Sequence, residues 1–320
     1  PALQRRLLIQ AARRAGVDLL HVPYFAGPRC TALPLVITVH DVIPFIFPEY
    51  AGGVPMRLYL RLVSAAARRA DAIITDSDCS RRDITRWLGI PPERIHVIPL
   101  AVDPAIRPRH DPEAAAALRQ RYGLPGPVIF NVGGVDVRKN LPVLIEAFAR
   151  ALPELPPETR LVIAGRAHAR NPRLYPPLEP VIRRCGVEGK VVLTGAISAE
   201  EKLAFYNLAD LYVFPSLYEG FGLSPLEAMA CGTPVIAADR ASLPEVVGSG
   251  GLLVEPTPPR LAAAMVSVLR DDGLRRDLAR RALAQAQTFS WERTAAQTRA
   301  VYRSVLASRQ PARAARVDHQ

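Results

Sequence analysis

Two glutamates, Glu219 and Glu227, stand eight residues apart at the ends of a short loop that contains two glycines. Gly220 and Gly222 carry no side chain, so the backbone amides around Phe221 can approach a ligand closely. A glycine loop that leads into the N-terminus of a helix attracts anions, because its N–H groups and the helix dipole both favour negative charge. The loop therefore predicts a site for a phosphate-bearing ligand, with a carboxylate at either end that can accept hydrogen bonds from sugar hydroxyls.

The two carboxylates also have simpler interpretations. Ser224 fits the N-cap of the following helix, Pro225 its first position and Glu227 its third, an arrangement typical of a capping box. Glu227 would then bond to the helix terminus alone, and Glu219 would be a solvated loop acid. The sequence leaves these interpretations open beside ligand binding.

A second loop of similar character follows the apolar run Val128–Val132. There two glycines form a turn, and Arg138 and Lys139 stand ahead of a helix whose expected N-cap is Asn140. Cations at a helix N-terminus oppose its dipole, at a cost of roughly a few tenths of a kcal/mol that a bound anion would offset. Lys139 is also one of only three lysines among 41 basic residues, so an ammonium group is rare in this chain. We expect both cations to bind phosphate.

Both loops follow apolar runs, and the alternation of such runs with helical patterns predicts an α/β chain with doubly wound parallel sheets. In such sheets ligands bind at the carboxyl ends of the strands. The expected strands are Val17–Val22, Leu35–Val39, Ala72–Thr75, Ile95–Ile98, Val128–Val132, Leu161–Ala164, Val191–Thr194, Leu211–Phe214, Pro234–Ala238 and Leu252–Val254. The expected helices include Val54–Arg69, Ser80–Leu88, Glu113–Tyr122, Leu141–Leu152, Tyr175–Cys185, Ala199–Leu208, Pro225–Cys231, Arg260–Leu269, Leu274–Thr288 and Ser290–Leu306. The segment Pro104–Pro112, rich in proline and arginine, is expected to be an exposed linker.

The stretch Pro215–Ala228 resembles the E-x7-E signature of retaining glycosyltransferases of family 4, which have the GT-B fold. The resemblance implies two Rossmann-like doubly wound domains that face a cleft. Residues 1–110 would form an acceptor-side domain that lacks its first strand and glycine-rich loop, so we expect it to be incomplete through truncation of the N-terminus. Residues 111–290 would bind the nucleotide sugar, residues 291–308 would form a helix that crosses back to the first domain, and residues 309–320 a tail.

The resemblance also implies a role for each candidate residue of the second domain. The diphosphate of the donor would be bound by Arg138, Lys139 and the backbone amides of Gly220, Phe221, Gly222 and Leu223. Glu227 would hold the ribose hydroxyls, and Glu219 would act as a catalytic residue that contacts the transferred sugar near the reacting carbon. His168 would lie near the base by analogy.

In the first domain the sequence Thr-Val-His-Asp that ends at Asp41 looks like the family's strand end with a sugar- or acceptor-contacting histidine. His40 would be the second catalytic residue and would orient the sugar, with Asp41 beside it. His21 is a weaker candidate for the sugar or acceptor side. The simpler interpretation of His40 is a hydrogen-bonded loop histidine.

The implied reaction is transfer of a hexose from a nucleotide sugar, GDP- or UDP-linked, to a hydroxyl of a glycan or lipid-linked acceptor in polysaccharide biosynthesis, with retention of configuration. The Arg138-Lys139-Asn140 sequence and the pair His40-Asp41 look most like members that use GDP-mannose, which favours a mannosyltransferase. A UDP-sugar epimerase of the same fold and an inactive, binding-only fragment are the alternatives. The fragment is considered because of the missing strands and because many members carry an arginine where this chain has Gly134.

The composition of the chain limits the other classes of partner and location that can be expected. The net charge of +11 would suit anionic substrates or a peripheral contact with an anionic membrane surface, although a general bias towards arginine gives the same number. No aromatic-interleaved basic patch is present, so nucleic acid is not an expected partner. No apolar run approaches the ~20 residues that a membrane span needs.

The histidines and cysteines do not indicate a metal or a disulfide framework. The four cysteines lie far apart without a CxxC pair, which favours a reduced, cytoplasmic location, either free or at the cytosolic face of a membrane. The histidines are scattered, and Asp76-Ser77-Asp78 is expected to cap a helix rather than bind a metal. We therefore expect no metal and no cofactor beside the nucleotide-sugar donor.

Overall fold

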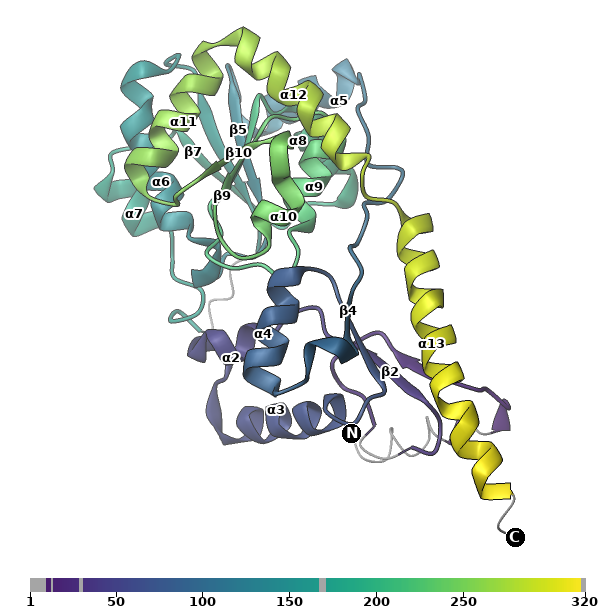
Figure 1. Ribbon diagram of the computed structural model, residues 1–320. Helices are drawn as coiled ribbons and strands as arrows, with labels where there is room; N and C mark the ends of the chain where they lie inside the picture. The colour runs from purple at the N-terminus through teal and green to yellow at the C-terminus, as the bar shows by residue number, and fades with distance from the viewer. Residues whose placement is uncertain (1–9, 13, 29–30, 167–170, 318–320) are drawn as a thin grey trace. The chain divides into compact units, whose positions relative to one another are not determined.

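The computed structural model describes residues 10–12, 14–28, 31–166 and 171–317. The chain divides into two compact units (Figure 1). The first unit comprises Pro1–Leu100 together with Trp291–Gln320, and the second comprises Ala101–Ser290. The boundary lies ten residues before the expected position at 110, because the linker segment packs with the second unit.

The first unit contains a parallel sheet of four strands in the order β1-β2-β3-β4. The strands are β1 (Leu20–Val22), β2 (Leu35–Thr38), β3 (Ala72–Thr75) and β4 (Ile95–Val97). Every residue of the two central strands is buried, as expected for a parallel sheet that is covered on both faces. The four strands predicted for this half of the chain are thus present, each within three residues of its expected bounds.

Helices cover both faces of this sheet. Helices α3 (Gly53–Ala67) and α4 (Asp78–Leu88) contribute to the core that contains Leu35 and Ile37. Helix α13 (Trp291–Val317) packs its residues Val301 and Val305 against Val36 on the opposite face. The alternation along β2 follows from the two-residue period of a strand. The short helix α2 (Ile43–Ile46) follows β2.

Helix α13 continues to Val317, where we expected a tail from residue 309. Residues 312–317 include three alanines and two arginines, which are strong helix formers. Arg309 pairs with Asp71 across the unit, at 2.5 Å between Nη2 and Oδ1. Among the residues that the structure describes, no helix combines the length and apolarity that a bilayer crossing requires.

The second unit contains a parallel sheet of six strands in the order β10-β9-β8-β5-β6-β7. The strands are β5 (Val128–Val132), β6 (Arg160–Ala164), β7 (Val191–Gly195), β8 (Leu211–Phe214), β9 (Val235–Ala238) and β10 (Leu252–Val254). The chain starts at β5, builds outward through β6 and β7, and then returns to pair β8 on the other side of β5. This reversal is a topological switch point, where the loops after two neighbouring strands diverge and leave room for a ligand.

The helices of the second unit are α5 (Pro112–Tyr122), α6 (Leu141–Ala151), α7 (Glu179–Arg184), α8 (Ala199–Leu208), α9 (Leu223–Ala230), α10 (Leu243–Val247), α11 (Pro258–Arg270) and α12 (Asp272–Ala286). The short 3₁₀ helices of both units are η1 (Pro48–Tyr50), η2 (Pro92–Arg94), η3 (Val137–Lys139), η4 (Leu152–Glu154) and η5 (Gly248–Gly250). One face of the sheet packs on α6 and α11, with Phe148 and Met265 fully buried. On the other face Phe130 of β5 stacks on Phe205 of α8, with 4.9 Å between ring centroids.

Two helices of the second unit also differ from expectation. Helix α7 begins at Glu179 rather than at Tyr175, because Pro176 and Pro177 lack the N–H groups that a helix interior needs and restrict the residues before them. Helix α10 was not predicted, since its five residues are too few for a helical period to be read from the sequence.

Candidate active site

The glycine loop after β8 runs into helix α9, which begins at Leu223 with Gly222 as its N-cap. Gly222 has a φ of 113°, a backbone conformation that favours glycine, and an added Cβ would also lie 2.9 Å from Cδ2 of Leu243. The predicted capping box at Ser224 is wrong: Ser224 lies inside the first turn, no side chain among the described residues caps the helix, and the carboxylate of Glu227 bonds to Tyr206 and Lys202 instead. The first turn of α9 is therefore without a side-chain cap, which suits its N–H groups to an anion.

Ser242 fixes the conformation of this loop. Its side chain is fully buried, and its hydroxyl lies within donating distance of two loop carbonyls, 2.8 Å from that of Glu219 and 2.6 Å from that of Phe221. The sequence did not single out Ser242, because it follows β9 and meets the loop only through the fold. The loop between the two glutamates is thus held in one shape before any ligand binds.

Glu219 is the centre of a buried cluster and not the solvated acid of the simpler interpretation. Its Oε1 lies 2.6 Å from Nζ of Lys139, 2.6 Å from Nη1 of Arg138 and 2.6 Å from Oγ of Ser216. The three charged side chains are only 10–13% exposed. Arg138 also donates to the carbonyl of Tyr218 at 2.7 Å. The structure thus brings together the two predicted phosphate-binding cations and the predicted catalytic glutamate.

The adjacency of β5 and β8 at the switch point accounts for this cluster. The chain leaves β5 and forms η3, which carries both cations, and Asp136 caps η3 by accepting from the backbone N–H of Arg138 at 3.2 Å. Asn140 occupies the expected N-cap position of α6, but with a left-handed φ of 56° and without a capping bond. Its side-chain amide instead donates to the carbonyl of Pro215 at 3.3 Å, which ties the two loops together.

The electrostatics of the cluster favour an ionised carboxylate. Burial raises the pKa of Glu219, but the adjacent Lys139 and Arg138 outweigh it and bring the pKa below its usual value. Burial lowers the pKa of Lys139, an effect that the Glu219 carboxylate opposes. The carboxylate therefore supplies the negative charge that the two cations require, at the place where we expected a phosphate.

Glu227 belongs to a second cluster at the other end of the loop. Nζ of Lys202 lies 2.8 Å from each of its carboxylate oxygens, and the hydroxyl of Tyr206 donates to Oε2 at 2.8 Å. The Glu227 side chain is 8% exposed and that of Lys202 is 30% exposed. Burial raises the pKa of Tyr206 well above its usual value, which keeps its hydroxyl protonated as a donor. Both oxygens of Glu227 are thus oriented by α8.

Sequence reasoning missed Lys202 and Tyr206, although a signal for them was present. They stand four residues apart on α8, a spacing that places both on one face of a helix. The chain contains three lysines, and two of them, Lys139 and Lys202, contact the two glutamates of the signature. The rarity that drew attention to Lys139 therefore applied equally to Lys202.

A cavity of about 420 Å³ opens at the carboxyl ends of β6 and β7 in the same unit. It is lined by Val135, Ile163, Gly165, Pro172, Tyr175, Pro176, Pro177, Leu178, Glu179, Leu193 and Gly195. Its size and mainly apolar lining match those of small-molecule pockets. His168, which the resemblance placed near a base, lies outside the described residues.

Two glycines at the ends of β5 and β6, Gly134 and Gly165, lie too close to neighbouring atoms for an added Cβ. A Cβ on Gly165 would lie 2.0 Å from the carbonyl oxygen of Gly133, so the end of β6 fits against the turn after β5 only as glycine. At Gly134, where many members of the resembled family carry arginine, a Cβ would lie 2.7 Å from Oδ2 of Asp136. The carboxylate of Asp136 therefore fills the space beside Gly134.

The first unit contains the remaining candidates. Nδ1 of His40, at the end of β2, lies 2.7 Å from Oδ2 of Asp76, at the end of β3. The hydrogen bond to Asp76 raises the pKa of His40, whose side chain is 42% exposed while that of Asp76 is 4% exposed. Asp41 accepts from the backbone N–H of Ile43 at 2.9 Å. Ser77 is the N-cap of α4, as the capping interpretation of this segment predicted.

His21 is accounted for by contacts inside the first unit. It lies in β1 on the face that α13 covers, with Nδ1 2.5 Å from the hydroxyl of Tyr302 and Nε2 2.8 Å from that of Thr38. Burial lowers its pKa. A role on the sugar or acceptor side remains a prediction for His21. In the described part of the chain, no three histidine, cysteine or acidic residues form a group that could hold a metal.

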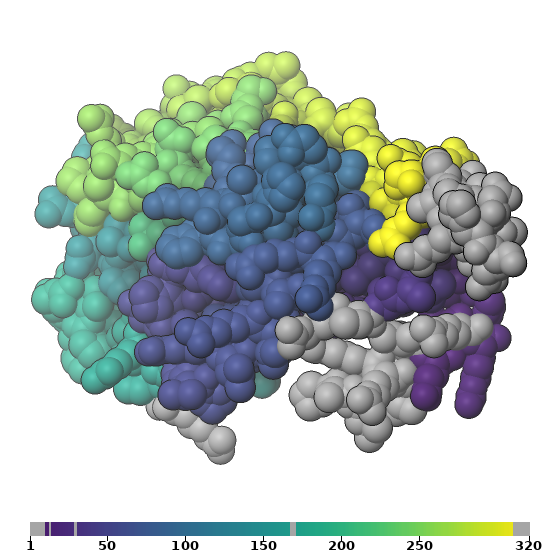
Figure 2. All heavy atoms as spheres, turned by 60° about the horizontal axis from the view of Figure 1, so that its bottom comes forward, coloured from purple at the N-terminus to yellow at the C-terminus, as the bar shows by residue number. Residues whose placement is uncertain are grey.

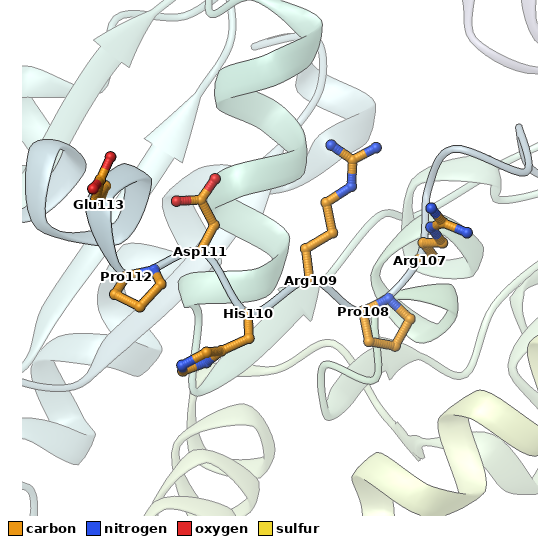
Figure 3. A pocket seen from close by; sticks show the side chains of 7 residues that line it. All are labelled: Arg107, Pro108, Arg109, His110, Asp111, Pro112 and Glu113. Carbon is orange, nitrogen blue, oxygen red and sulfur yellow. The ribbon is translucent and has the colours of Figure 1, made fainter.

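The linker segment of the second unit is exposed, as expected, but it is attached to α8. Residues 107–113 line a surface hollow of about 810 Å³, from which Arg109 and His110 extend in opposite directions (Figure 3). Oδ1 of Asn207 accepts from the backbone N–H of Arg109 at 2.6 Å. The helix that orients Glu227 through Lys202 therefore also holds the linker.

Comparison with known families covers nearly the whole chain. The family model described as Glycosyl transferases group 1 matches residues 117–285, and that described as Glycosyltransferase Family 4 matches residues 1–106. The match of the first model contains both glutamate clusters and both loops.

Curated relatives are about one third identical to this chain over the aligned residues. O-antigen chain mannosyltransferase B of Escherichia coli is 35% identical over 275 residues, which cover 84% of this chain and 70% of that protein. The serotype-specific mannosyltransferase WbdA of Escherichia coli is 33% identical over 81% of this chain, but the chain spans only 32% of its length. D-inositol 3-phosphate glycosyltransferase of Xylanimonas cellulosilytica is 33% identical over 96% of this chain and 76% of that protein.

Solved structures share the fold. Sucrose-phosphate synthase from Thermosynechococcus elongatus superposes with a TM-score of 0.78 at 26% identity, over 93% of this chain and 76% of that one. The Anabaena protein HepE in complex with UDP gives a TM-score of 0.77 at 24% identity, over 94% and 81% of the two chains. The expected α/β fold of two doubly wound domains is confirmed.

Proposed function

Because this chain belongs to the glycosyl transferases group 1, we propose that it transfers mannose from GDP-mannose to a hydroxyl of a glycan or lipid-linked acceptor, with retention of configuration. The family makes the chain a hexosyltransferase with the GT-B fold. The donor, the acceptor, the stereochemical course and the role of each residue are the proposal. A cytosolic site, where nucleotide sugars would be available, is part of it.

The observation that carries the proposal is the cluster of Arg138, Lys139 and Glu219 at the switch point. The donor diphosphate takes the place of the Glu219 carboxylate beside the two cations and also approaches the N-terminus of α9. Cations and a helix terminus that are already in position stabilise the charge that develops on a leaving diphosphate. Arg138 and Lys139 are then paired with an anion both in the free protein, by Glu219, and in the donor complex, by the diphosphate.

The exchange frees Glu219 for the sugar. Released from Lys139 and Arg138, its carboxylate contacts the hydroxyls of the transferred hexose near the reacting carbon. Glu227 binds the ribose hydroxyls at the other end of the loop. A carboxylate has about four lone-pair positions, and Lys202 and Tyr206 leave positions on Glu227 for a diol.

The base and the acceptor side complete the proposed arrangement. The cavity at the ends of β6 and β7 has a size and lining suited to a nucleobase. His40, oriented by Asp76, contacts the sugar from the first unit. Retention is achieved by front-face displacement, in which an oxygen of the donor phosphate accepts the proton of the acceptor hydroxyl and no protein nucleophile is needed.

Two observations support mannose as the sugar. Relatives at 33–35% identity are named mannosyltransferases, and the Arg138-Lys139-Asn140 sequence resembles that of family members that use GDP-mannose. A relative at 33% identity is named D-inositol 3-phosphate glycosyltransferase, so the choice of donor needs a direct test.

The test is donor turnover with and without acceptor. GDP-mannose, UDP-glucose and UDP-N-acetylglucosamine, each labelled in the sugar, are incubated with the chain and a panel of oligosaccharide and lipid-linked acceptors. We expect acceptor-dependent transfer from GDP-mannose, lost in Lys139→Ala and retained in Lys190→Ala, which removes a lysine of the same unit away from the cluster. Turnover of a UDP-sugar without acceptor, to its epimer, would contradict the proposal, as would the absence of transfer from every donor.

A further inference from the structure

Helix α3 of the first unit exposes an apolar and basic stripe. Val54 and Leu58 are 77% and 56% exposed, although the helix that carries them packs on a core. Arg57 and Arg61 are also exposed. These four residues follow the spacing i, i+3, i+4, i+7 and therefore lie along one face of the helix. We call them the α3 stripe.

The opposite face of α3 is buried, so the stripe is turned away from the core. Leu60, Val63, Ala66 and Ala67 are at most 7% exposed. In Figure 2 the residues of α3, in the blue-violet of the colour bar near residue 60, lie uncovered at the surface of the first unit. The stripe is therefore accessible to a partner.

The charge of the stripe is of one sign. The sequence of α3 contains no aspartate or glutamate, and within the described residues neither Arg57 nor Arg61 has an ion-pair or hydrogen-bond partner. Cations interleaved with aliphatic side chains suit a surface that is apolar below and anionic above, because arginine stems lie along the apolar layer while the guanidinium groups reach the charged layer.

A second exposed group lies near the C-terminal end of the same helix. Arg68, just after α3, donates from Nε to the carbonyl of Leu88 at the end of α4, at 2.6 Å. The neighbouring Trp87 is 40% exposed, and the guanidinium of Arg86 lies 5.5 Å from the centre of its ring. Tryptophan and arginine are both enriched at the headgroup level of membranes. Like the stripe, this group therefore combines an exposed apolar side chain with a neighbouring arginine.

We propose that the α3 stripe docks the first unit on an anionic lipid bilayer, with Val54 and Leu58 in the outer apolar layer and Arg57 and Arg61 among the lipid phosphates. A second copy of this chain would bring the arginines of two stripes together, and like charges across an interface are unfavourable. The proposal goes beyond the transfer reaction and does not depend on which nucleotide sugar is the donor.

The test is co-sedimentation of the full chain with vesicles of phosphatidylcholine alone and of equal parts phosphatidylcholine and phosphatidylglycerol, at low salt. The double variant Arg57→Gln with Arg61→Gln should bind the anionic vesicles more weakly, by about fivefold for each arginine. Val54→Ser with Leu58→Ser should also weaken binding, because apolar insertion and charge are both required. All four side chains are exposed, so the thermal midpoint of each variant should remain at the wild-type value.

A matched control separates the stripe from the overall charge of +11. Arg150 and Arg276 are exposed residues of the second unit, and changing both to glutamine removes the same charge. This control should change vesicle binding by less than about twofold, since its charges lie outside the proposed surface. Equal losses in the control and in the α3 variant would overturn the proposal. So would wild-type protein that fails to bind anionic vesicles, or a dimer that only the stripe variants abolish.

Discussion

Replacing Glu219 by glutamine separates the two roles of this carboxylate. In the unliganded structure Oε1 of Glu219 lies 2.6 Å from Nζ of Lys139 and 2.6 Å from Nη1 of Arg138. Glutamine keeps the shape of the side chain and one acceptor oxygen but removes its charge. The two cations would then be buried beside each other without a carboxylate between them.

The size of the effect follows from the burial of the three side chains, which are only 10–13% exposed. Removing one partner of a buried ion pair costs about 3–5 kcal/mol, and the remaining amide oxygen places this variant near about 3 kcal/mol. For a unit of this size we expect the thermal midpoint to fall by about 6–12 °C. If the diphosphate of GDP relieves about half of that loss, GDP should bind about tenfold more tightly than to the wild type.

The assay combines thermal denaturation with calorimetric titration of GDP, and sugar transfer is measured in parallel. We expect Glu219→Gln to be less stable, to bind the nucleotide more tightly and to transfer no sugar. Glu146→Gln is the control, because it removes a glutamate whose pair with Arg184 is at the surface, with side chains 35% and 63% exposed. If Glu219→Gln has the same thermal midpoint as Glu146→Gln and binds GDP no more tightly than the wild type, the proposed competition between carboxylate and diphosphate is refuted.

Three further outcomes follow from the structure. Lys202→Met should lower the free energy of unfolding by roughly 1–3 kcal/mol and weaken nucleotide binding, because Tyr206 is then the one side-chain donor, of the two described above, left to the buried Glu227 carboxylate. The loss is moderate because water reaches the partly exposed site. A melting curve and a nucleotide titration that match the wild type would exclude a role of Lys202 in orienting Glu227. Gly165→Ala should abolish nucleotide binding in calorimetry, because its Cβ would displace the turn after β5, and unchanged affinity would contradict the packing. The hydrogen bond to Asp76 raises the pKa of His40. The free energy of unfolding of the wild type, relative to that of His40→Gln, should therefore be greatest below pH ~6.5 and decrease as the pH rises through the raised pKa of His40. Denaturant melts of both proteins at several pH values test this.

The elements of the fold were predictable because their signals are local. Mainly apolar runs of three to six residues predicted the strands of both sheets, including β5 and β8, whose pairing creates the switch point. The prolines before Glu179 also carried a local signal, and the helix there was predicted too long because that signal was not applied. Elements as short as α10 lack a period that could reveal them.

The candidate site was predictable in its members but not in their partners. Arg138, Lys139 and Glu219 were each identified, yet the sequence did not show that the glutamate itself is the anion beside the two cations. For Glu227 the sequence left a capping box open beside ribose binding, because spacing within one helix is visible in the sequence, whereas its partner Lys202 stands 25 residues earlier and reaches it only in the folded protein. Contacts between segments distant in sequence decide which of two locally reasonable roles a side chain takes.

The central claim is that the cluster at the switch point binds the diphosphate of a nucleotide-sugar donor. Calorimetric titration of the chain with GDP, UDP and ADP, together with Lys139→Ala and Glu227→Ala, tests it most directly. We predict saturable binding of GDP that is lost in both variants and retained in Lys190→Ala. A folded protein that binds none of the three nucleotides, or that binds one equally well in both variants, would contradict the claim.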